Sequence, residues 1–407
     1  MNCRHCNSFL RQTFADLGFA PPSNAYLSKR DLSKPEKYYP LKVKVCEECW
    51  LVQTEDYANA DELFSSDYAY FSSTSTSWLT HAKEYSNKII SRLNLNKDSY
   101  VIEVASNDGY LLKNFKESNI PCLGIEPTES TAHAAEAIGI NVIKKFFGEK
   151  LASKLAVEGK QADLIIGNNV YAHVPDINDF TKGLKALLKP TGIITLEFPH
   201  LLRLIEGTQF DTIYHEHFSY LSLYSVSKIF ASCGLRIWDV EELKTHGGSL
   251  RVYGCHEDDS REILPSVASI LSKEESYGLR KIETYKNFQP KVEKIKNDLL
   301  TFLIGQKEKG KRVVAYGAAA KGNTLLNYAG IKPDLLPVVF DAAESKQGKF
   351  LPGSHIPILN PHKMDQISTE YLLILPWNIS VEIKEQLKEN LKKQPQFLAA
   401  IPHLSFL

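Results

Sequence analysis

Residues 100–112 read YVIEVASNDGYLL, and this stretch decides the fold of the middle of the chain. It begins with an apolar run that contains β-branched side chains, which predicts a buried strand over residues 100–104. Small and polar residues follow and predict a tight turn, and a helical pattern then covers residues 109–116. A strand that passes through such a turn into a helix is the first half of a βαβ unit.

The same alternation extends on both sides of this stretch. A helical pattern precedes it at residues 78–93, and strand and helix patterns follow it, over residues 122–125, 131–137, 164–167, 179–188, 192–198 and 223–233. Two further strand-like runs, 235–240 and 249–255, are joined by a THGG turn without a helix, so we expect them to pair antiparallel. The pattern predicts an α/β fold with a parallel sheet covered by helices on both faces.

Length and composition limit the remaining possibilities. The chain has 407 residues, which suggests two or three domains, and we expect these to be residues 1–75, 76–258 and 259–407. The last part starts with charged helices and becomes a second α/β pattern at residue 312. Because 48 basic side chains balance 48 acidic ones, a general nucleic-acid or membrane-surface binder is disfavoured. Neither a membrane-spanning run nor a signal peptide is visible, so we expect a cytoplasmic protein.

Four of the seven cysteines form two C-x-x-C pairs near the start of the chain: Cys3, Cys6, Cys46 and Cys49. Two such pairs supply the thiolates of a tetrahedral zinc site, and four cysteines leave no open position for a catalytic water. A redox dithiol is the rival interpretation, but it usually has a single C-x-x-C that opens a helix. We therefore predict a small zinc-binding module in which the metal is structural.

Polar and small residues gather where the predicted parallel strands end. In open α/β sheets the ligand lies beyond the carboxyl ends of the strands. An acidic residue on the first strand repels a pyrophosphate but suits the amine-bearing end of S-adenosylmethionine, and a carboxylate after the second strand suits a ribose. These residues predict a methyltransferase cofactor site rather than an NAD site, with the following candidates: Glu103, Ala105, Ser106, Asn107, Gly109, Glu126, Pro127, Asn168 and Asn169.

A second candidate site is the run Tyr214-His-Glu-His217. A histidine is the common general base near neutral pH, and a tyrosine can donate to a developing oxyanion. Glu216 could orient a histidine or contact the substrate, and His215 with His217 could bind a metal, although no third ligand is evident nearby. A polar loop without function is the other alternative. Weaker candidates are His173, Tyr68, Tyr70, His200 and His246, and for the last two we expect a structural role.

The whole chain resembles the sugar C-methyltransferases of deoxysugar biosynthesis. The likeness rests on the two C-x-x-C pairs and on EVASNDGYL, GIEP, GNNVYAHV, EFPH, YHEHFSYLS, THGGSLR and YGAAAKGNTLLN. It implies a class I, Rossmann-like methyltransferase domain between an N-terminal zinc module and a second Rossmann-like α/β domain. Typical members methylate C-3 of thymidine-diphosphate 4-keto-deoxysugars, so the resemblance implies S-adenosylmethionine and a nucleotide-sugar as the two reactants.

The resemblance also implies roles for particular residues. Tyr214, Glu216 and His217 would line the reaction centre, with His217 as the base. His173 and Tyr68 would be further active-site members, and Tyr70 beside Tyr68 keeps that assignment open. The base would remove the proton next to the 4-keto group, and the resulting enolate carbon would accept the methyl group.

The C-terminal α/β pattern carries a candidate substrate site. A strand leads through YGAAAKGN into a helix, where N-terminal amides and a lysine can hold a diphosphate. Our candidates for substrate binding are Tyr70, Ser249, Tyr316, Gly317, Lys321 and Asn323. The same strand–helix pattern also fits an NAD-dependent oxidoreductase acting on a nucleotide-sugar, although the usual three glycines are missing. A non-catalytic zinc-containing binding protein is the third alternative.

Overall fold

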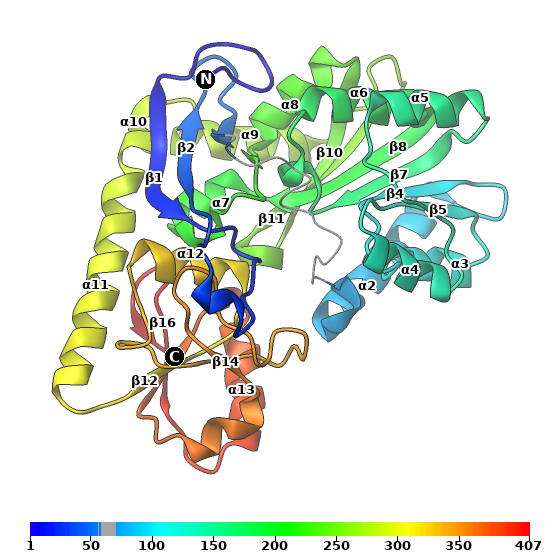
Figure 1. Cartoon of the computed structure of the whole chain (residues 1–407). Helices are drawn as coiled ribbons and strands as arrows, with labels where there is room; N and C mark the ends of the chain where they lie inside the picture. The colour runs from blue at the N-terminus through cyan, green and yellow to red at the C-terminus, as the bar shows by residue number, and fades with distance from the viewer. Residues whose placement is uncertain (56, 58–70) are drawn as a thin grey trace.

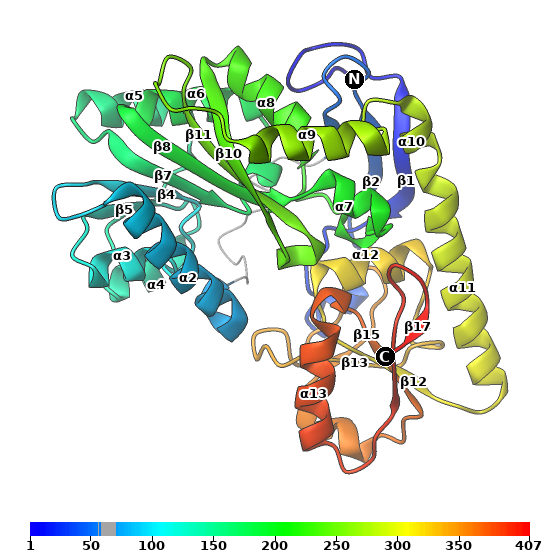
Figure 2. The same ribbon diagram turned by 180° about the vertical axis from the view of Figure 1, so that it is seen from behind.

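The structure is a computed structural model that describes residues 1–55, 57 and 71–407. The strands of these residues form three sheets, with four, seven and six strands. Figure 1 shows the four-stranded sheet beside the seven-stranded one, and the six-stranded sheet below both. Figure 2 shows from behind that the long helix α11 (Phe288–Glu308) runs along the edge that connects the upper and lower parts.

The seven-stranded sheet has the order β10-β11-β8-β7-β4-β5-β6. Its strands are β4 (Val101–Val104), β5 (Cys122–Ile125), β6 (Val142–Ile143), β7 (Ala162–Asn168), β8 (Leu188–Pro199), β10 (Leu235–Leu243) and β11 (Ser249–His256). The strands from β8 to β6 pair in parallel, whereas β11 pairs antiparallel with both β8 and β10. The predicted antiparallel pair at the end of the sheet is thereby confirmed.

Helices cover both faces of this sheet (Figure 1). They are α2 (Thr76–Leu93), α3 (Leu112–Glu117) and α4 (Glu129–Ala137) on one face, and α5 (Glu149–Val157), α6 (Ile177–Leu187) and α8 (Leu223–Ser232) on the other. Each face has its own apolar core, one built around Phe115 and the other around Phe180 and Phe230. The parallel strands are buried on both sides, as expected for a sheet of this type.

Two details of this region differ from the sequence prediction. The first helix begins at Leu112 and not at residue 109, because left-handed backbone at Asn107 and Gly109 extends the turn. The short strand β6 and the helix α5 were not predicted. Strand β6 has only two residues and shows no period, whereas α5 has apolar residues at helical spacing, at Leu151, Ala152, Leu155 and Ala156, which were an available signal.

The six-stranded sheet has the order β14-β13-β12-β15-β16-β17, parallel except for its last pair. Its elements are β12 (Val313–Tyr316), β13 (Val339–Phe340), β14 (Ile358–Leu359), β15 (Tyr371–Ile374), β16 (Gln396–Ala399), β17 (Ser405–Phe406), and the helices α12 (Ala320–Tyr328) and α13 (Ser380–Asn390). The second α/β unit is therefore confirmed. Helices α9 (Pro265–Tyr277), α10 (Ile282–Lys286) and α11 connect the two larger sheets.

The four-stranded antiparallel sheet contains β1 (Gln12–Ala20), β2 (Tyr39–Val45), β3 (Val52–Thr54) and β9 (Ser219–Tyr220), in that order. Its last strand comes from the middle of the chain, directly after the YHEH run. One apolar core also joins Phe14 of β1 to Leu299 of α11 and Leu325 of α12. The N-terminal module is therefore packed against both of the other parts, and the predicted domain boundaries stay a prediction.

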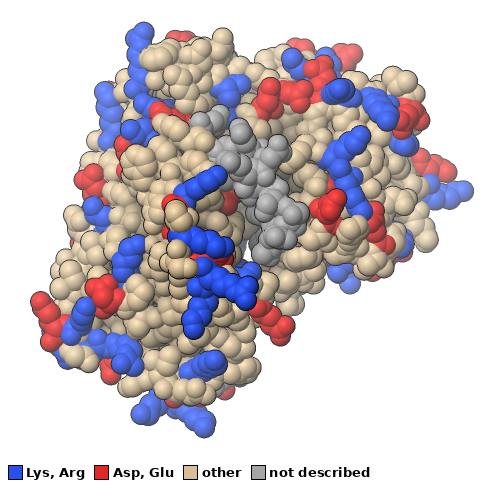
Figure 3. Space-filling model, in the orientation of Figure 1, with Lys and Arg blue, Asp and Glu red and all other residues tan. Residues whose placement is uncertain are grey.

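In the described part of the chain, no helix combines the length and the apolar character needed to cross a bilayer. Acidic and basic side chains are interspersed on the face shown in Figure 3, and one group of basic side chains lies near its centre.

His200 has the structural role predicted for it. Its Nε2 lies 2.7 Å from Oε1 of the buried Glu274, which also accepts hydrogen bonds from the backbone N–H groups of Leu223 and Tyr224 at the start of α8. One carboxylate thus accepts hydrogen bonds from two backbone N–H groups at the start of α8 and also binds a histidine from another segment. Removing it would leave several buried polar groups without partners.

We predict that Glu274→Ala destabilises the protein by about 3–5 kcal/mol, because it breaks a buried charged network. Urea unfolding measures the change. Glu275→Ala is the matched control, because the Glu275 side chain is 48% exposed and should contribute little. Equal effects of the two substitutions would contradict the role assigned to Glu274.

Candidate functional site

The two C-x-x-C pairs meet in one cluster. Their sulfur atoms all lie within 4.8 Å of one another, and the residues concerned are Cys3, Cys6, Cys46 and Cys49. Both pairs form the same turn: the residue after the second cysteine, Asn7 or Trp50, has a positive φ and donates its N–H to the carbonyl of the first cysteine. Four convergent thiols in two equivalent turns fit a tetrahedral zinc ion. The zinc site predicted from the sequence is confirmed, and its closed ligand set gives the metal a structural role.

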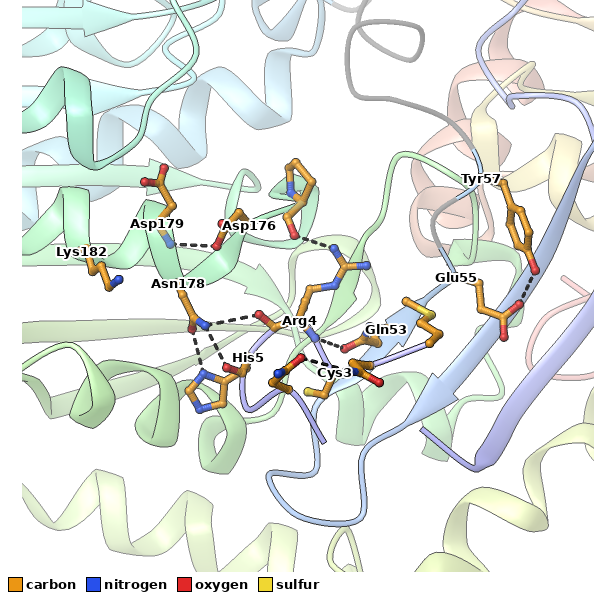
Figure 4. A pocket seen from close by; sticks show the side chains of 14 residues that line it. Cys3, Arg4, His5, Gln53, Glu55, Tyr57, Asp176, Asn178, Asp179 and Lys182 are labelled. Carbon is orange, nitrogen blue, oxygen red and sulfur yellow. Dashed lines mark hydrogen bonds between the residues drawn. The ribbon is translucent and has the colours of Figure 1, made fainter. Parts of the chain in front are cut away.

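The first turn of the zinc site contacts the seven-stranded sheet's helices. Asn178 in α6 lies 2.9 Å from His5 Nδ1, and its Nδ2 donates to the carbonyls of Arg4 and His5. Figure 4 shows these side chains together with Gln53 along a cavity of about 920 Å³. The zinc module is therefore attached directly to the element that follows β7.

The carboxyl ends of β4, β5 and β7 hold the predicted cofactor residues. Glu103 is 1% exposed, and neither of its carboxylate oxygens has a partner within ordinary hydrogen-bond geometry among the described residues, although the Tyr110 side chain lies near enough to lower its pKa. Burial raises its pKa well above the usual range, and the nearby Asp108 and Glu126 raise it further. Ser106 Oγ and both side-chain amide atoms of Asn168 are also buried without partners in this part of the structure.

Such a set of unsatisfied groups is costly unless a ligand covers it. A carboxylate with a raised pKa gains most from a cation, which a ligand's ammonium or sulfonium group provides. The hydroxyl and the amide can bind the ligand's polar atoms. The residues at this edge therefore fit S-adenosylmethionine.

The turns beside Glu103 have the conformation that close ligand approach needs. Ala105 and Asn107 have φ values of +59° and +48°. A Cβ atom on Gly109 would lie 3.1 Å from Ile138, so this position has little room for a side chain. Glu126, followed by Pro127, accepts hydrogen bonds from the N–H groups of Asn107 and Thr128 at 2.9 Å each. The carboxylate of Glu126 thus fixes the first turn to the second strand.

Two histidines lie together after β7 and before β9. The rings of His173 and His217 are 4.6 Å apart between centroids and edge to face. His217 Nδ1 lies 2.7 Å from the carbonyl oxygen of Thr212, and His173 Nδ1 lies 2.7 Å from that of Glu216. Because a carbonyl oxygen can only accept, each Nδ1 carries the proton and each Nε2 keeps its lone pair. Both rings therefore present a basic nitrogen.

Burial keeps both histidines neutral. It lowers the pKa of His173 to about 4, and it lowers the pKa of His217 well below the usual value, with His173 and Lys321 adding to the effect. The ring of Tyr214 lies 4.0 Å from that of His217 between centroids. The YHEH run thus forms a compact group of side chains that can accept and donate protons.

The other members of this run point elsewhere or remain partly unsatisfied. Glu216 Oε1 accepts from Asn24, while its buried Oε2 has no partner among the described residues, and burial raises its pKa to about 7. The ring of His215 packs edge to face against Tyr39, 5.9 Å from it. Among the described residues, three or more side chains converge as metal ligands only in the cysteine cluster. No third ligand therefore joins His215 and His217, and their interpretation as a metal site gains no support.

The helix α12 brings Lys321 to the same region. Lys321 Nζ lies 3.1 Å from Asn378 Oδ1 and 5.0 Å from the centre of the Trp377 ring, and burial lowers the pKa of this lysine. Thr324 Oγ1 donates to the carbonyl of Ile213, one residue before the YHEH run. The C-terminal α/β unit is therefore fixed against the histidines.

The remaining predicted substrate residues differ in their surroundings. Asn323 Nδ2 donates to the carbonyl of Ser23, and Ser249 Oγ donates to that of Thr245, so both already make contacts within the fold. Gly317 packs closely, because a Cβ there would lie 2.3 Å from Pro376. Tyr316 is half-buried next to it. Tyr68 and Tyr70 lie outside the described residues.

His246, for which we expected a structural role, lies beside Asn169, whose Nδ2 is 3.0 Å from its Nε2, and its ring packs edge to face against Trp78. Burial lowers the pKa of His246 to about 4, and its φ of +53° lies in the left-handed region. The THGG turn that joins two strands accounts for this backbone, since histidine tolerates that conformation better than most residues. The structural role stays a prediction.

A further acidic residue, Glu197, was not predicted. It lies near the end of β8, and it accepts hydrogen bonds from His81, Thr245 and Arg251. Burial by itself raises the pKa of Glu197, but these partners hold it at about 2. Glu197 therefore stays ionised and fixes the loop that carries His246.

Comparisons with known proteins cover the chain almost from end to end. Family models match a zinc binding domain at residues 3–64, a methyltransferase domain at 78–240 and a C-methyltransferase C-terminal domain at 244–402. The C-methyltransferase NovU of Streptomyces niveus is 34% identical over 400 residues, which cover 98% of this chain and 95% of NovU.

Solved structures match the chain more weakly. The PH0226 protein of Pyrococcus horikoshii OT3 is 14% identical, with a TM-score of 0.38, and covers 49% of this chain and 100% of its own. Magnesium protoporphyrin IX methyltransferase from Synechocystis PCC 6803 with bound SAH is also 14% identical, with a TM-score of 0.35, and covers 44% of this chain and 83% of its own.

We predict that Cys46→Ser loses zinc and unfolds the N-terminal module, because structural zinc contributes about 10–16 kcal/mol to the folding of small domains. Metal analysis of the purified protein and its thermal unfolding measure both effects. Cys122→Ser is the control, because Cys122 lies outside the cluster and should retain the metal. A Cys46→Ser protein with a full complement of zinc would reject the four-cysteine site.

We predict that stabilisation by S-adenosylmethionine increases with pH and that Glu103→Gln removes this dependence. In the ligand-free protein the raised pKa means that protonated Glu103 stabilises the folded state relative to the unfolded chain. This stabilisation is complete below the ordinary glutamate pKa and is lost as the pH rises through the raised pKa. A bound cation lowers this pKa again, so binding releases a proton. Thermal unfolding with and without ligand across pH measures the effect, and the exposed Glu117→Gln is the control. An unchanged pH profile in Glu103→Gln would contradict the assignment.

Proposed function

This chain belongs to the S-adenosylmethionine-dependent C-methyltransferases, and from that premise we propose that it methylates a carbon of a nucleotide-linked sugar. The proposed acceptor carbon lies next to a keto group, C-3 of a dTDP-4-keto-deoxysugar. One observation carries the proposal: His217 donates Nδ1–H to the Thr212 carbonyl, which leaves an unprotonated Nε2 with its lone pair in a buried site. Methylation at carbon needs such a base, because a C–H proton must first be removed.

The segment after β7 links this base to the cofactor edge. Asn168 ends β7 with unsatisfied amide atoms, Asn169 contacts His246, and His173 follows in the short 3-10 helix η3 (Tyr171–His173). The ring of His173 then meets that of His217. Six consecutive residues, 168–173, thus connect the cofactor site with the two basic nitrogens.

The proposed reaction proceeds through an enolate of the sugar. His217 Nε2 takes the proton from the carbon beside the keto group, and the electrons of the broken C–H bond move onto the keto oxygen. We propose Tyr214 and Lys321 as the donors to that oxygen. The carbon would then form the new C–C bond as the keto group returns, while the bond between the methyl group and the sulfonium sulfur breaks and leaves its electron pair on a neutral thioether. S-adenosylmethionine, when bound, supplies the electrophilic methyl group.

Glu216 is better placed to contact the sugar than to orient His217. The Nδ1 of His217 already binds Thr212, and that of His173 binds the backbone of Glu216 and not its carboxyl group. The unsatisfied Oε2 of Glu216 is therefore available to a sugar hydroxyl. A pKa of about 7 lets this group act as either donor or acceptor near neutral pH.

The nucleotide part of the substrate needs positive charge and a cleft between parts of the chain. Figure 3 shows basic side chains near the centre of one face, which could supply this charge. The six-stranded sheet offers less support for an NAD site. The turn after β12 is filled by the protein itself, since Asp341 accepts from Ala318 N and Tyr26 donates to Ala318 O. This arrangement disfavours the oxidoreductase alternative.

We predict that His217→Asn lowers kcat by about 10²–10⁴-fold, the usual contribution of a general base. The assay is mass spectrometry of methyl transfer to nucleotide 4-keto-deoxysugars, with deuterium uptake at the acceptor carbon as a second readout. Thermal stabilisation by S-adenosylhomocysteine should persist, because His217 lies outside the Glu103 edge. The exposed His133→Asn is the control. If His173→Asn abolished deuterium uptake while His217→Asn retained it, the assignment of the base would be wrong.

A further inference from the structure

Arg4 lies between the first two ligands of the zinc site, and its side chain makes contacts far from the metal. Its NH1 donates to the carbonyl of Pro175 at 2.7 Å, and its NH2 donates to that of Thr54 at 3.1 Å. The guanidinium carbon lies 5.4 Å from the centre of the Phe218 ring. Figure 4 shows Arg4 extended from the zinc turn between Gln53 and the start of α6.

The two carbonyls that Arg4 binds belong to the segments that carry the histidines. Pro175 follows His173 by two residues in the chain. Thr54 ends β3, and its Oγ1 donates to the carbonyl of His217 at 3.1 Å. His173 in turn donates to the carbonyl of Glu216, the neighbour of His217.

These contacts form a closed circuit. It runs from Arg4 to Pro175 and His173, across to Glu216 and His217, and back through Thr54 to Arg4. The backbone N–H of Arg4 also donates to Gln53 Oε1 at 3.0 Å, and Gln53 pairs with Ser219 of β9. The circuit therefore connects the zinc turn to both histidines through side-chain donors of Arg4, His173 and Thr54, each of which binds a backbone carbonyl.

We propose that Arg4 is a positioning residue that sets the distance between His173 and His217 and thereby the direction of the His217 Nε2. The role requires arginine in particular. A guanidinium can donate in two directions from one rigid plane, whereas the single nitrogen of a lysine cannot keep the same two carbonyls in that geometry. Because Arg4 lies between Cys3 and Cys6, the zinc site fixes the backbone position from which its guanidinium extends. In its catalytic consequence, the inference rests on the proposed function.

The test compares Arg4→Lys and Arg4→Met with Arg11→Lys, an exposed arginine of the same module. In protein with ¹⁵N-labelled histidine, we expect both Arg4 variants to shift the ring signals of His173 and His217, and Arg11→Lys to leave them unchanged. Zinc content and stabilisation by S-adenosylhomocysteine should match the parent protein. We expect kcat to fall by up to about 10²-fold, because a small misplacement of a reacting group can lower the rate by that much. The KM for the methyl donor should change little.

Unchanged ring signals in both Arg4 variants would overturn the proposal, as would unchanged kcat in an active protein. Loss of zinc together with activity would overturn it too, because Arg4 would then support the metal site only. If the Arg4 variants fail to fold, Thr54→Val opens the circuit at another contact and should shift the His217 signals. A parent protein inactive on every 4-keto sugar would refute the proposed function instead, and the ring signals would still decide the role of Arg4.

Discussion

The pairing of β3 with β9 is the constraint on which the rest of the site depends. Val52 lies opposite Tyr220 and Gln53 opposite Ser219, so a strand that starts at the zinc site adds a strand from the middle of the chain to its own sheet. The YHEH run leads directly into β9 and cannot move independently of the metal-bound turns. The zinc ion would hold the two C-x-x-C turns together, while the apolar side chains of β1 and β2 belong to the core shared with α11 and α12. Zinc thus affects the reaction centre through the backbone, without taking part in the chemistry.

The proposed cofactor edge lies at the seven-stranded sheet and the proposed base, His217, lies just before β9 of the four-stranded sheet, and the segment after β7 runs between them. Among the described residues, Glu103 and Asn168 keep buried polar atoms without hydrogen-bond partners on one side of that segment, and the paired rings of His173 and His217 lie on the other. Burial suits each group to its chemistry, because it favours a cationic ligand at Glu103 and keeps the histidines neutral and able to accept a proton. The C-terminal unit completes the site through Lys321 and through the Thr324 contact to Ile213.

Local patterns predicted much of this arrangement, and long-range contacts account for part of what was missed. The two C-x-x-C pairs, the strand–turn–helix around Glu103 and the YHEH run are short motifs whose chemistry can be recognised without the fold. The contacts of His246 and Arg4 involve partners distant in sequence, Asn169 for one and Pro175 for the other, which no local pattern reveals. Strand β6 was missed because two residues are too few to show a period, whereas the apolar spacing of α5 was a local signal that could have predicted it. Tyr68 and Tyr70 lie outside the described residues, so their assignment stays a prediction.

The most direct test of the account is ¹³C NMR of the product formed from S-adenosylmethionine labelled in its methyl group and a dTDP-4-keto-deoxysugar. A methyl carbon bonded to carbon differs clearly in chemical shift from one bonded to oxygen or nitrogen, and its couplings identify the sugar carbon that carries it. The account predicts one labelled methyl group on the carbon beside the keto group. A label on a hydroxyl oxygen would contradict it, because oxygen methylation needs no enolate and no base of the kind that His217 provides.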